Sequence, residues 1–197
     1  MRFLLRILLP ASISIVITGC VPIIIGTGVT TGGYIAVRDK RVGDSIKDTK
    51  IEAEIKKRLY GISAQLHSDV SVISDHGNVL LTGNVHNPDW VNIAEKEAWA
   101  TDGVVVVDNC LVFGEEISAS QAMKDGLITS SCRTSLLCDS NIKSVNYKIK
   151  TMNGVVHLLG IARSKDELKL VLSKIQSISG VQKIISYVNL QQKKRSQ

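Results

Sequence analysis

The chain has 197 residues, enough for one ordinary domain or two small ones, and its hydrophobic content of 44% excludes disorder throughout. Only 4% of the residues are aromatic, so any core must be built from Val, Ile, Leu and Ala. The formal net charge of +6 favours an anionic partner, either a phospholipid surface or a nucleic acid.

The first residues have the pattern of an export signal. Arg2 and Arg6 supply positive charge, and an apolar run follows from Ile7 to Val16. This run is too short to span a membrane, which takes about 20 predominantly apolar residues. The remaining alternatives are a signal peptide and a buried helix.

The sequence Ile17-Thr18-Gly19-Cys20 favours the signal peptide. It resembles the bacterial lipobox, in which a small residue precedes a cysteine whose thiol receives diacylglycerol before cleavage. The resemblance implies a lipoprotein signal peptide over residues 1–19 and an acylated Cys20, carrying diacylglycerol and palmitate, at the start of the mature chain. The alternative is a chance cysteine after an ordinary signal. The residue after the cysteine is Val21 and not Asp. In this type of signal, a residue other than Asp at that position points to the outer membrane.

Residues 20–45 are predicted to form a flexible, lipid-anchored linker. Their Gly26-Thr27-Gly28 sequence lacks the third glycine and the βαβ context of a dinucleotide-binding loop. A flexible chain from Cys20 to Asp48 would span roughly 25 to 30 Å, so the first domain could lie near the membrane or away from it.

Beyond the linker, the chain repeats itself at a constant offset of 77 residues without a gap. Agreement at helix, strand and turn positions is improbable by chance, so the chain carries the same domain twice. The clearest pairs are Gly77–Gly83 with Gly154–Gly160, Gly103-Val104 with Gly180-Val181, and Asp48 with Asp125.

Hydrophobic periods predict the elements of each unit in chain order. A period of four predicts a first helix with one buried face, and alternation around a turn then predicts a β-hairpin. The helix positions are Ile51, Ile55 and Leu59 in the first unit and Ile128, Cys132 and Leu136 in the second; the turns lie at His76-Gly77 and Asn153-Gly154.

A second helix follows each hairpin. Asn87 is the expected N-cap before Pro88 in the first unit, and Ser164 with Glu167 forms a capping box in the second. Each helix runs into a Gly-Val pair and a third strand, so the order is αββαβ. A right-handed crossover places strands two and three parallel, which predicts an α+β fold with two helices on one face of a three-stranded mixed sheet. Each unit is near the lower size limit for independent folding, so the two are expected to pack together.

This order, with its Gly-x-Val-x-Leu-x-Gly strand in both units, resembles the BON domain. Two such domains behind a lipobox resemble the dual-BON outer-membrane lipoproteins of Gram-negative bacteria, whose lead-in is also similar to Asp39–Gly43. The expected boundaries are 46–115 and 118–191 for the two BON domains and 192–197 for a basic tail. The resemblance implies an anionic phospholipid membrane as partner and a role in envelope integrity, without catalysis.

The residues themselves offer no pattern for catalysis, a cofactor or a metal. The four histidines have no metal-ligand spacing, and neither a nucleophile elbow nor a pair of carboxylates stands out. Cys110, Cys132 and Cys138 are an odd number in an oxidising compartment, which argues against a disulfide framework. Cys132 is predicted to be buried, and a bridge between Cys132 and Cys138 stays open.

Charge separates the two units. Residues 38–117 carry 9 Lys and Arg against 14 Asp and Glu, a net charge of −5, whereas residues 118–197 carry 13 against 4, a net charge of +9. The second unit is therefore the one suited to an anionic surface, where each basic side chain contributes about 1 kcal/mol. The candidate cations are Lys124, Arg133, Lys143, Lys148 and Lys150.

The first helix of the second unit carries a further apolar stripe. Met123, Leu127 and Leu137 fall roughly opposite the predicted buried face, where core packing does not need them. In the first unit, Lys50 and Lys57 interrupt the same stripe. An interfacial role is predicted; the alternatives are packing on the first domain or on another subunit. In the resembling lipoproteins this helix contacts the membrane, with Trp where this chain has Leu127.

These observations favour a non-enzymatic, lipid-anchored protein on the periplasmic face of the outer membrane. Its second domain is predicted to bind anionic phospholipid and to support envelope integrity. The competing hypothesis is an adaptor whose stripe docks an outer-membrane assembly or secretion component. The predicted export disfavours nucleic acid as a partner. The candidate phospholipid-binding residues are Met123, Lys124, Leu127, Arg133 and Leu137.

Overall fold

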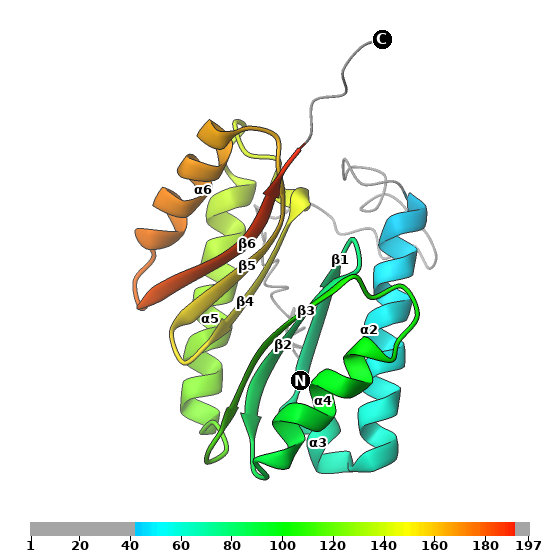
Figure 1. The fold of residues 1–197 in the computed structure, drawn as a ribbon. Helices are drawn as coiled ribbons and strands as arrows, with labels where there is room; N and C mark the ends of the chain where they lie inside the picture. Colours follow the sequence, from blue (N-terminus) through cyan, green and yellow to red (C-terminus); the bar gives the residue numbers. More distant parts are fainter. Residues whose placement is uncertain (1–41, 192–197) are drawn as a thin grey trace, which may run out of the picture.

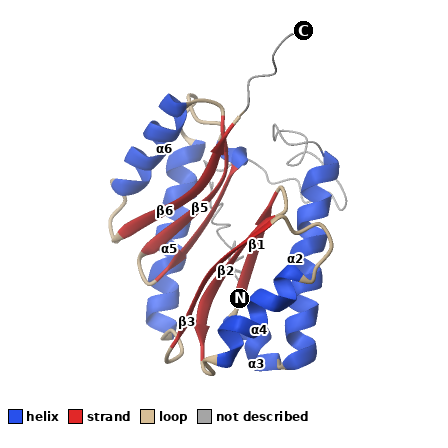
Figure 2. Ribbon diagram, viewed as in Figure 1, coloured by secondary structure: helices blue, strands red, loops and turns tan. Residues whose placement is uncertain are grey.

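The computed structural model describes residues 42–191, which form two three-stranded sheets that each carry their own helices (Figure 1). Figure 2 shows the helices on the outer sides of the two sheets. The predictions for the signal peptide, for Cys20, for most of the linker and for the basic tail lie outside the described residues.

In the first unit, β2 is the central strand of the sheet. It pairs antiparallel with β1, with Ile73 opposite Leu80, and parallel with β3, with Leu81 beside Asn109. The elements are α2 (Val42–Ile62), α3 (Ala64–Asp69), β1 (Ser71–Asp75), β2 (Asn78–Val85), α4 (Asp89–Trp99) and β3 (Val106–Phe113).

The second unit repeats this topology with β5 in the centre, antiparallel to β4 and parallel to β6. The predicted α+β fold with two mixed three-stranded sheets is therefore confirmed. The elements are α5 (Ala119–Leu137), the 3-10 turn η1 (Ser144–Asn146), β4 (Tyr147–Met152), β5 (Val155–Ala162), α6 (Lys165–Gln176) and β6 (Lys183–Leu190).

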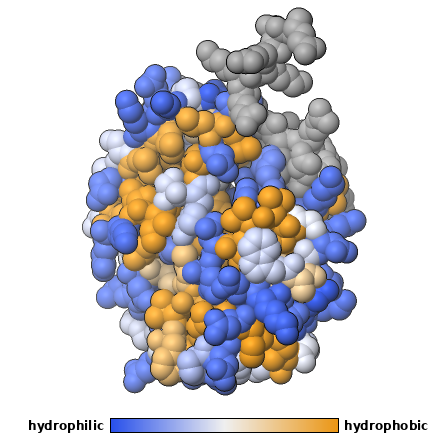
Figure 3. Space-filling model, in the orientation of Figure 1, coloured by the Kyte–Doolittle hydropathy of each residue, from blue (hydrophilic) through white to orange (hydrophobic). Residues whose placement is uncertain are grey.

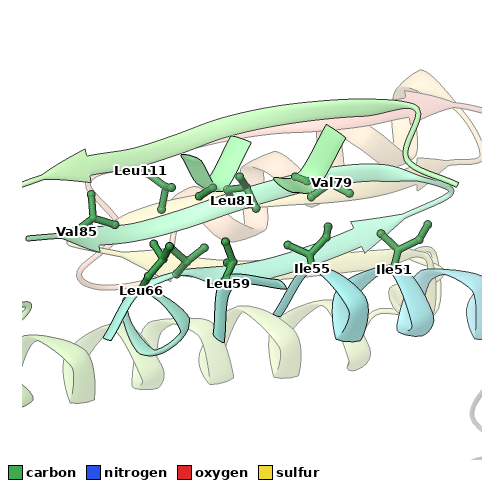
Figure 4. Close-up of a cluster of buried hydrophobic side chains, with 11 residues drawn as sticks. Ile51, Ile55, Leu59, Leu66, Val79, Leu81, Val85 and Leu111 are labelled. Carbon is green, nitrogen blue, oxygen red and sulfur yellow. The ribbon is translucent and has the colours of Figure 1, made fainter. Parts of the chain in front are cut away.

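The core of each unit lies between its sheet and its two helices. In the first unit, Ile51, Ile55 and Leu59 of α2 point at Val79 and Leu81 of β2, and all five side chains are buried (Figure 4). Ala94 and Ala98 of α4 join the same cluster, so both helices cover one face. The second unit has an equivalent cluster on α5 and α6. The predicted helix periods therefore identified the buried faces.

Glycines allow two features that both units share. His76 and Gly77 in one hairpin turn, and Asn153 and Gly154 in the other, have φ values between 49° and 78°, as a tight two-residue turn requires. At the far end of the central strand, a Cβ on Gly83 would overlap the carbonyl oxygen of Asp69. A Cβ on Gly160 would overlap the carbonyl oxygen of Asn146 in the same way. The repeated glycine motif is thus a requirement of the backbone.

The structure differs from the sequence prediction at four helix positions. Helix α2 begins at Val42, four residues ahead of the expected domain start, and α3 was not predicted. In the first unit Pro88, not Asn87, occupies the N-cap position, although the Asn87 side chain still accepts a hydrogen bond from the Asp89 N–H at 2.9 Å. Ser164 caps α6 as predicted, but the Glu167 carboxylate accepts from the N–H of Arg163, one residue earlier than in a capping box.

The two sheets face each other through the sides that carry no helices, which gives the order helix, sheet, sheet, helix (Figure 1). Leu80 of β2 and Leu159 of β5 point away from their own helices and are nevertheless fully buried. Across this interface the Cys110 Sγ lies 3.0 Å from the hydroxyl of Tyr187. The expected packing between the units is thus observed.

Candidate functional site

A buried aspartate fixes the rotation of the first helix in each unit. The Asp125 carboxylate on α5 accepts hydrogen bonds from the N–H groups of Asn153 at 2.7 Å and Gly154 at 2.9 Å in the hairpin turn. Asp48 on α2 accepts from the N–H groups of His76 and Gly77 at 3.1 and 3.0 Å. Because the turn holds the helix through this carboxylate, it also determines which face of α5 points outward.

The inner face of α5 packs on the second sheet. Ile128, Cys132 and Leu136 are buried, as predicted, and burial raises the pKa of the Cys132 thiol to about 11. Cys138 follows the end of the helix and is exposed, and the three cysteines of the described residues are all free. The bridge between Cys132 and Cys138 left open by the sequence is therefore not formed.

The outer face of α5 carries the predicted apolar stripe. Met123, Leu127 and Leu137 are 67%, 65% and 70% exposed, so the first unit does not cover them. Met123 and Leu127 are one helical turn apart, whereas Leu137 lies roughly 15 Å further along the axis. Ser130 and Thr134 occupy the stretch between them. The stripe is thus apolar at both ends and polar in the middle.

Apolar exposure by itself does not single out this helix. On the face shown in Figure 3, hydrophobic residues form several areas separated by hydrophilic ones. Trp99, Val105 and Phe113 of the first unit are each at least half exposed. The location of α5 in an outer layer and the positive charge of its unit are what distinguish its stripe.

The candidate cations divide into two groups. Lys124 is exposed and lines a hollow together with Leu127, so it lies next to the stripe. Arg133 lies on another side of the helix, about 120° around the axis from Leu127, where its guanidinium donates to the carbonyl of Ile149 at 3.1 Å. The structure brings Met123, Lys124 and Leu127 together, and it separates Arg133 from them.

Lys148 was predicted as a surface cation and is instead held at the interface. Its ammonium group donates to a Glu52 carboxylate oxygen at 2.8 Å and to the carbonyl of Ser74 at 2.6 Å, both in the first unit. Sequence reasoning missed this role because the charge pattern of one strand does not reveal which surface its outward side chains meet.

The sequence matches the BON domain family over residues 47–115 and 124–192. The chain belongs to the BON domain family. It is 31% identical over 189 residues to the outer membrane lipoprotein DolP of Haemophilus influenzae, covering 94% of this chain and 96% of that protein. It is 37% identical to a protein of Anaplasma centrale described as an uncharacterized protein in the gshII 5′ region, covering 76% and 98%. It is 28% identical to a 21 kDa hemolysin of Actinobacillus pleuropneumoniae, covering 78% and 79%.

The two BON domains enclose a cleft that sequence reasoning missed. It has a volume of about 490 Å³ and opens between the start of β1 and the side of α5 that carries Arg133. Its first-domain wall contributes hydroxyl groups, as does its second-domain wall, which adds two cations. The polar side chains in its lining include Ser68, Asp69, Ser71 and Thr82 of BON domain 1 and Asp125, Thr129, Arg133 and Lys150 of BON domain 2.

A larger hollow of about 620 Å³ lies on BON domain 1 alone, between α2 and the hairpin turn. Its walls include Lys47, Lys50 and Arg58 together with Glu54 and Asp102. Arg58 pairs with Glu54 at 3.5 Å, so charges of both signs meet there. The cleft between the domains also has Asp69 and Asp125 in its lining, but its two cations, Arg133 and Lys150, form no ion pair among the described residues.

Two further findings concern the described residues as a whole. Within residues 42–191, no group of three or more His, Cys, Asp or Glu side chains could hold a metal ion. Over the same range, no helix has both the length and the apolar character needed to cross a membrane.

Proposed function

We propose that the protein is anchored through acylated Cys20 to the periplasmic face of the outer membrane, and that BON domain 2 binds anionic phospholipid to support envelope integrity. The contact surface is the outer face of α5, with Met123, Lys124 and Leu127 at one end and Leu137 at the other. The protein acts by binding and not by catalysis. Its near full-length similarity to a protein named as an outer membrane lipoprotein supports this location.

The observation that carries the proposal is the difference between α5 and the equivalent helix α2. The exposed Leu127, near the N-terminal end of the stripe, corresponds to Lys50 in BON domain 1. Thr134, in the middle of the stripe, corresponds to Lys57. Only the second copy therefore presents large apolar side chains without lysines between them. It lies in residues 118–197, which together with the basic tail have a net charge of +9.

The expected strength of this contact is modest. Full burial of a Leu or Met side chain contributes roughly 1.5–3 kcal/mol, and a basic residue near an anionic surface adds about 1 kcal/mol. Such a contact is weak for a free protein. It suffices for a tethered one, because a lipid anchor keeps the domain at a high effective concentration near the bilayer.

Binding to vesicles tests the lipid contact. Residues 21–197, which lack both the predicted signal peptide and the anchor site so that only the domains bind, are mixed with phosphatidylglycerol or phosphatidylcholine vesicles and sedimented. We expect binding to the first type alone, a loss of about tenfold in Leu127→Asp, and further weakening at high salt. Ile46→Asp is the matched control, since Ile46 is an exposed apolar residue at the position equivalent to Met123.

Two results would contradict the proposal. One is equal binding to both vesicle types, which would remove the electrostatic part. The other is equal loss in Leu127→Asp and Ile46→Asp, which would mean that α5 has no special role. Crosslinking from position 127 in cells separates lipid from protein: crosslinks to a single envelope protein, with none to lipid, would favour the adaptor hypothesis.

A further inference from the structure

The interface between the BON domains has approximate two-fold symmetry. Cys110 and Tyr187, which touch across it, occupy the same position in the two copies at the offset of 77 residues. Contact between equivalent residues is the signature of a self-complementary interface. Each contact on one side of the axis should therefore have an equivalent on the other side.

On one side of the two-fold axis, an ion pair fills the space between the two domains. Glu52 on α2 accepts a hydrogen bond from the Ser74 N–H at 2.7 Å and pairs with Lys148 of the other domain at 2.8 Å. Lys148 also donates to the carbonyl of Ser74. This side of the interface is closed by two long side chains of opposite charge.

On the other side the same positions carry short hydroxyl side chains. Thr129 corresponds to Glu52 and accepts a hydrogen bond from the Thr151 N–H at 3.2 Å, as Glu52 does from Ser74. Ser71 corresponds to Lys148 and is too short to reach across. The cleft of about 490 Å³ lies here. It is therefore the space that an ion pair fills on the opposite side of the axis.

Positive charge collects around this space. Lys150 and Arg133 line the cleft, and no carboxylate among residues 42–191 forms an ion pair with either of them. Lys56 of the other domain is near enough to Lys150 that burial and then the charge of Lys150 lower the pKa of Lys56. The two ammonium groups thus repel each other across the interface, although Lys56 does not itself line the cleft.

Two carboxylates also line the cleft, but neither forms an ion pair with Arg133 or Lys150. The Asp69 carboxylate accepts hydrogen bonds from His86 at 2.8 Å and from Gln65 at 2.8 Å, and the Asp125 carboxylate accepts from the hairpin turn, so other donors already occupy their oxygens. In addition, the Thr82 hydroxyl on the cleft wall is buried without a hydrogen-bond partner. An unsatisfied buried hydroxyl is costly and indicates a missing partner.

We infer that the cleft between the BON domains binds a small phosphorylated polyol. The phosphate accepts hydrogen bonds from Arg133 and Lys150, and the polyol hydroxyls pair with Ser71 and Thr82. Arg and Lys are the usual phosphate partners, and the volume lies within the range of small-molecule sites. Such a group occurs in a glycerophospholipid headgroup and in free sugar or glycerol phosphates.

The first test is a titration of the full chain with sn-glycerol 3-phosphate, in which isothermal titration calorimetry measures the binding. We expect saturable binding, weaker binding of inorganic phosphate, and none of glycerol. Lys150→Gln should weaken binding by at least about tenfold, as expected when a charge-assisted hydrogen bond is lost. Lys165→Gln, which removes an exposed lysine from α6, should leave it unchanged.

The symmetry supplies a second variant that keeps the fold. Ser71→Lys combined with Thr129→Glu places in the cleft the same ion pair that Lys148 and Glu52 form on the other side. Because the interface already accepts this pair once, the double variant should fold, keep its melting temperature within a few degrees, and lose glycerol phosphate binding. Unchanged affinity in the double variant, or no saturable binding by the original chain below about 10 mM, would overturn the inference.

The proposal for the cleft and the proposal for the membrane surface can be disproved independently of each other. Leu127→Asp should leave glycerol phosphate binding unchanged, since Leu127 does not line the cleft. If Lys150→Gln also weakens binding to phosphatidylglycerol vesicles, the cleft takes a lipid headgroup. If vesicle binding is unaffected while glycerol phosphate binding is lost, the cleft takes a soluble phosphate ester.

Discussion

The two BON domains keep identical residues where the backbone requires them and differ where their surfaces meet something else. The turn-binding aspartates Asp48 and Asp125 and the close-contact glycines Gly83 and Gly160 are shared. The outward helix faces and the charges are not shared: one region has a net charge of −5 and the other of +9. Duplication thus preserved the scaffold while the surfaces took on separate tasks.

The interface shows the same division at closer range. A pair of identical domains meeting face to face would make every contact twice. Here one of the two equivalent contacts is an ion pair between Glu52 and Lys148, and the other has become a polar cleft beside Ser71 and Thr129. Substitutions in only one copy are enough to convert a symmetric contact into a binding site.

The largest expected effect tests whether the shared glycines are equivalent. Gly83→Ala and Gly160→Ala should each lower the free energy of unfolding by roughly 3–5 kcal/mol, because the new Cβ meets a backbone carbonyl that cannot move away. Thermal unfolding followed by circular dichroism measures both. Gly126→Ala in α5 has open space around its Cβ and should stabilise the helix by about 0.5–1 kcal/mol. A cost below that of an ordinary surface substitution at either glycine would break the equivalence.

A middle-sized effect is expected for the turn-binding aspartates. Asp48→Ala and Asp125→Ala should each destabilise by roughly 1–3 kcal/mol, since both leave two N–H groups of a hairpin turn without an acceptor. Urea unfolding provides the measurement. Asp102→Ala, an exposed residue close to the first turn, should change stability by less than about 0.5 kcal/mol. Unequal losses would show that the two turns are not held in the same way.

The smallest effect concerns His157, which corresponds to Leu80 at the centre of the interface. Its Nδ1 is buried without a partner, so His157→Leu should stabilise the chain by about 1 kcal/mol near pH 8. Burial, and then the charge of Lys183, lower the pKa of His157 in the folded state. Below about pH 6.5 the unfolded chain therefore binds a proton at this histidine that the folded chain does not bind. The free energy of unfolding consequently decreases as the pH is lowered.

The gain from His157→Leu should accordingly be larger at pH 5 than at pH 8. Chemical denaturation at the two pH values measures this difference, and the other three histidines cancel because both proteins carry them. A pH-independent gain would show that His157 reaches solvent when protonated, and that the interface is looser there than the structure indicates.

Much of the fold followed from periodicity in the sequence. The four-residue spacing of Ile128, Cys132 and Leu136 identified the buried side of α5, and the residues left over were the exposed ones. Helix α3 escaped prediction because it is six residues long and buries only Leu66, which gives no period to detect. The packing of the two sheets on each other was not predicted, for a different reason.

A strand buried on one side alternates, whereas one buried on both sides does not. The continuous apolar run Val79-Leu80-Leu81 carried that signal, but one strand cannot reveal what covers its second face. The same limit applies to the cleft, whose walls come from segments about 60 residues apart in sequence, such as Ser71 and Arg133. Charge counting assigned Lys148 to a surface because it ignores the domain opposite.

The burial of Leu80 and Leu159 against one another's domains has a consequence for the order of events during synthesis. The first copy precedes the second by 77 residues, so wherever the chain folds as it emerges, the first copy is complete before the second is available to cover it. For that interval the newborn protein displays an unpaired apolar sheet surface. Its early life is therefore a period of vulnerability to aggregation, which ends when the second copy closes over the first.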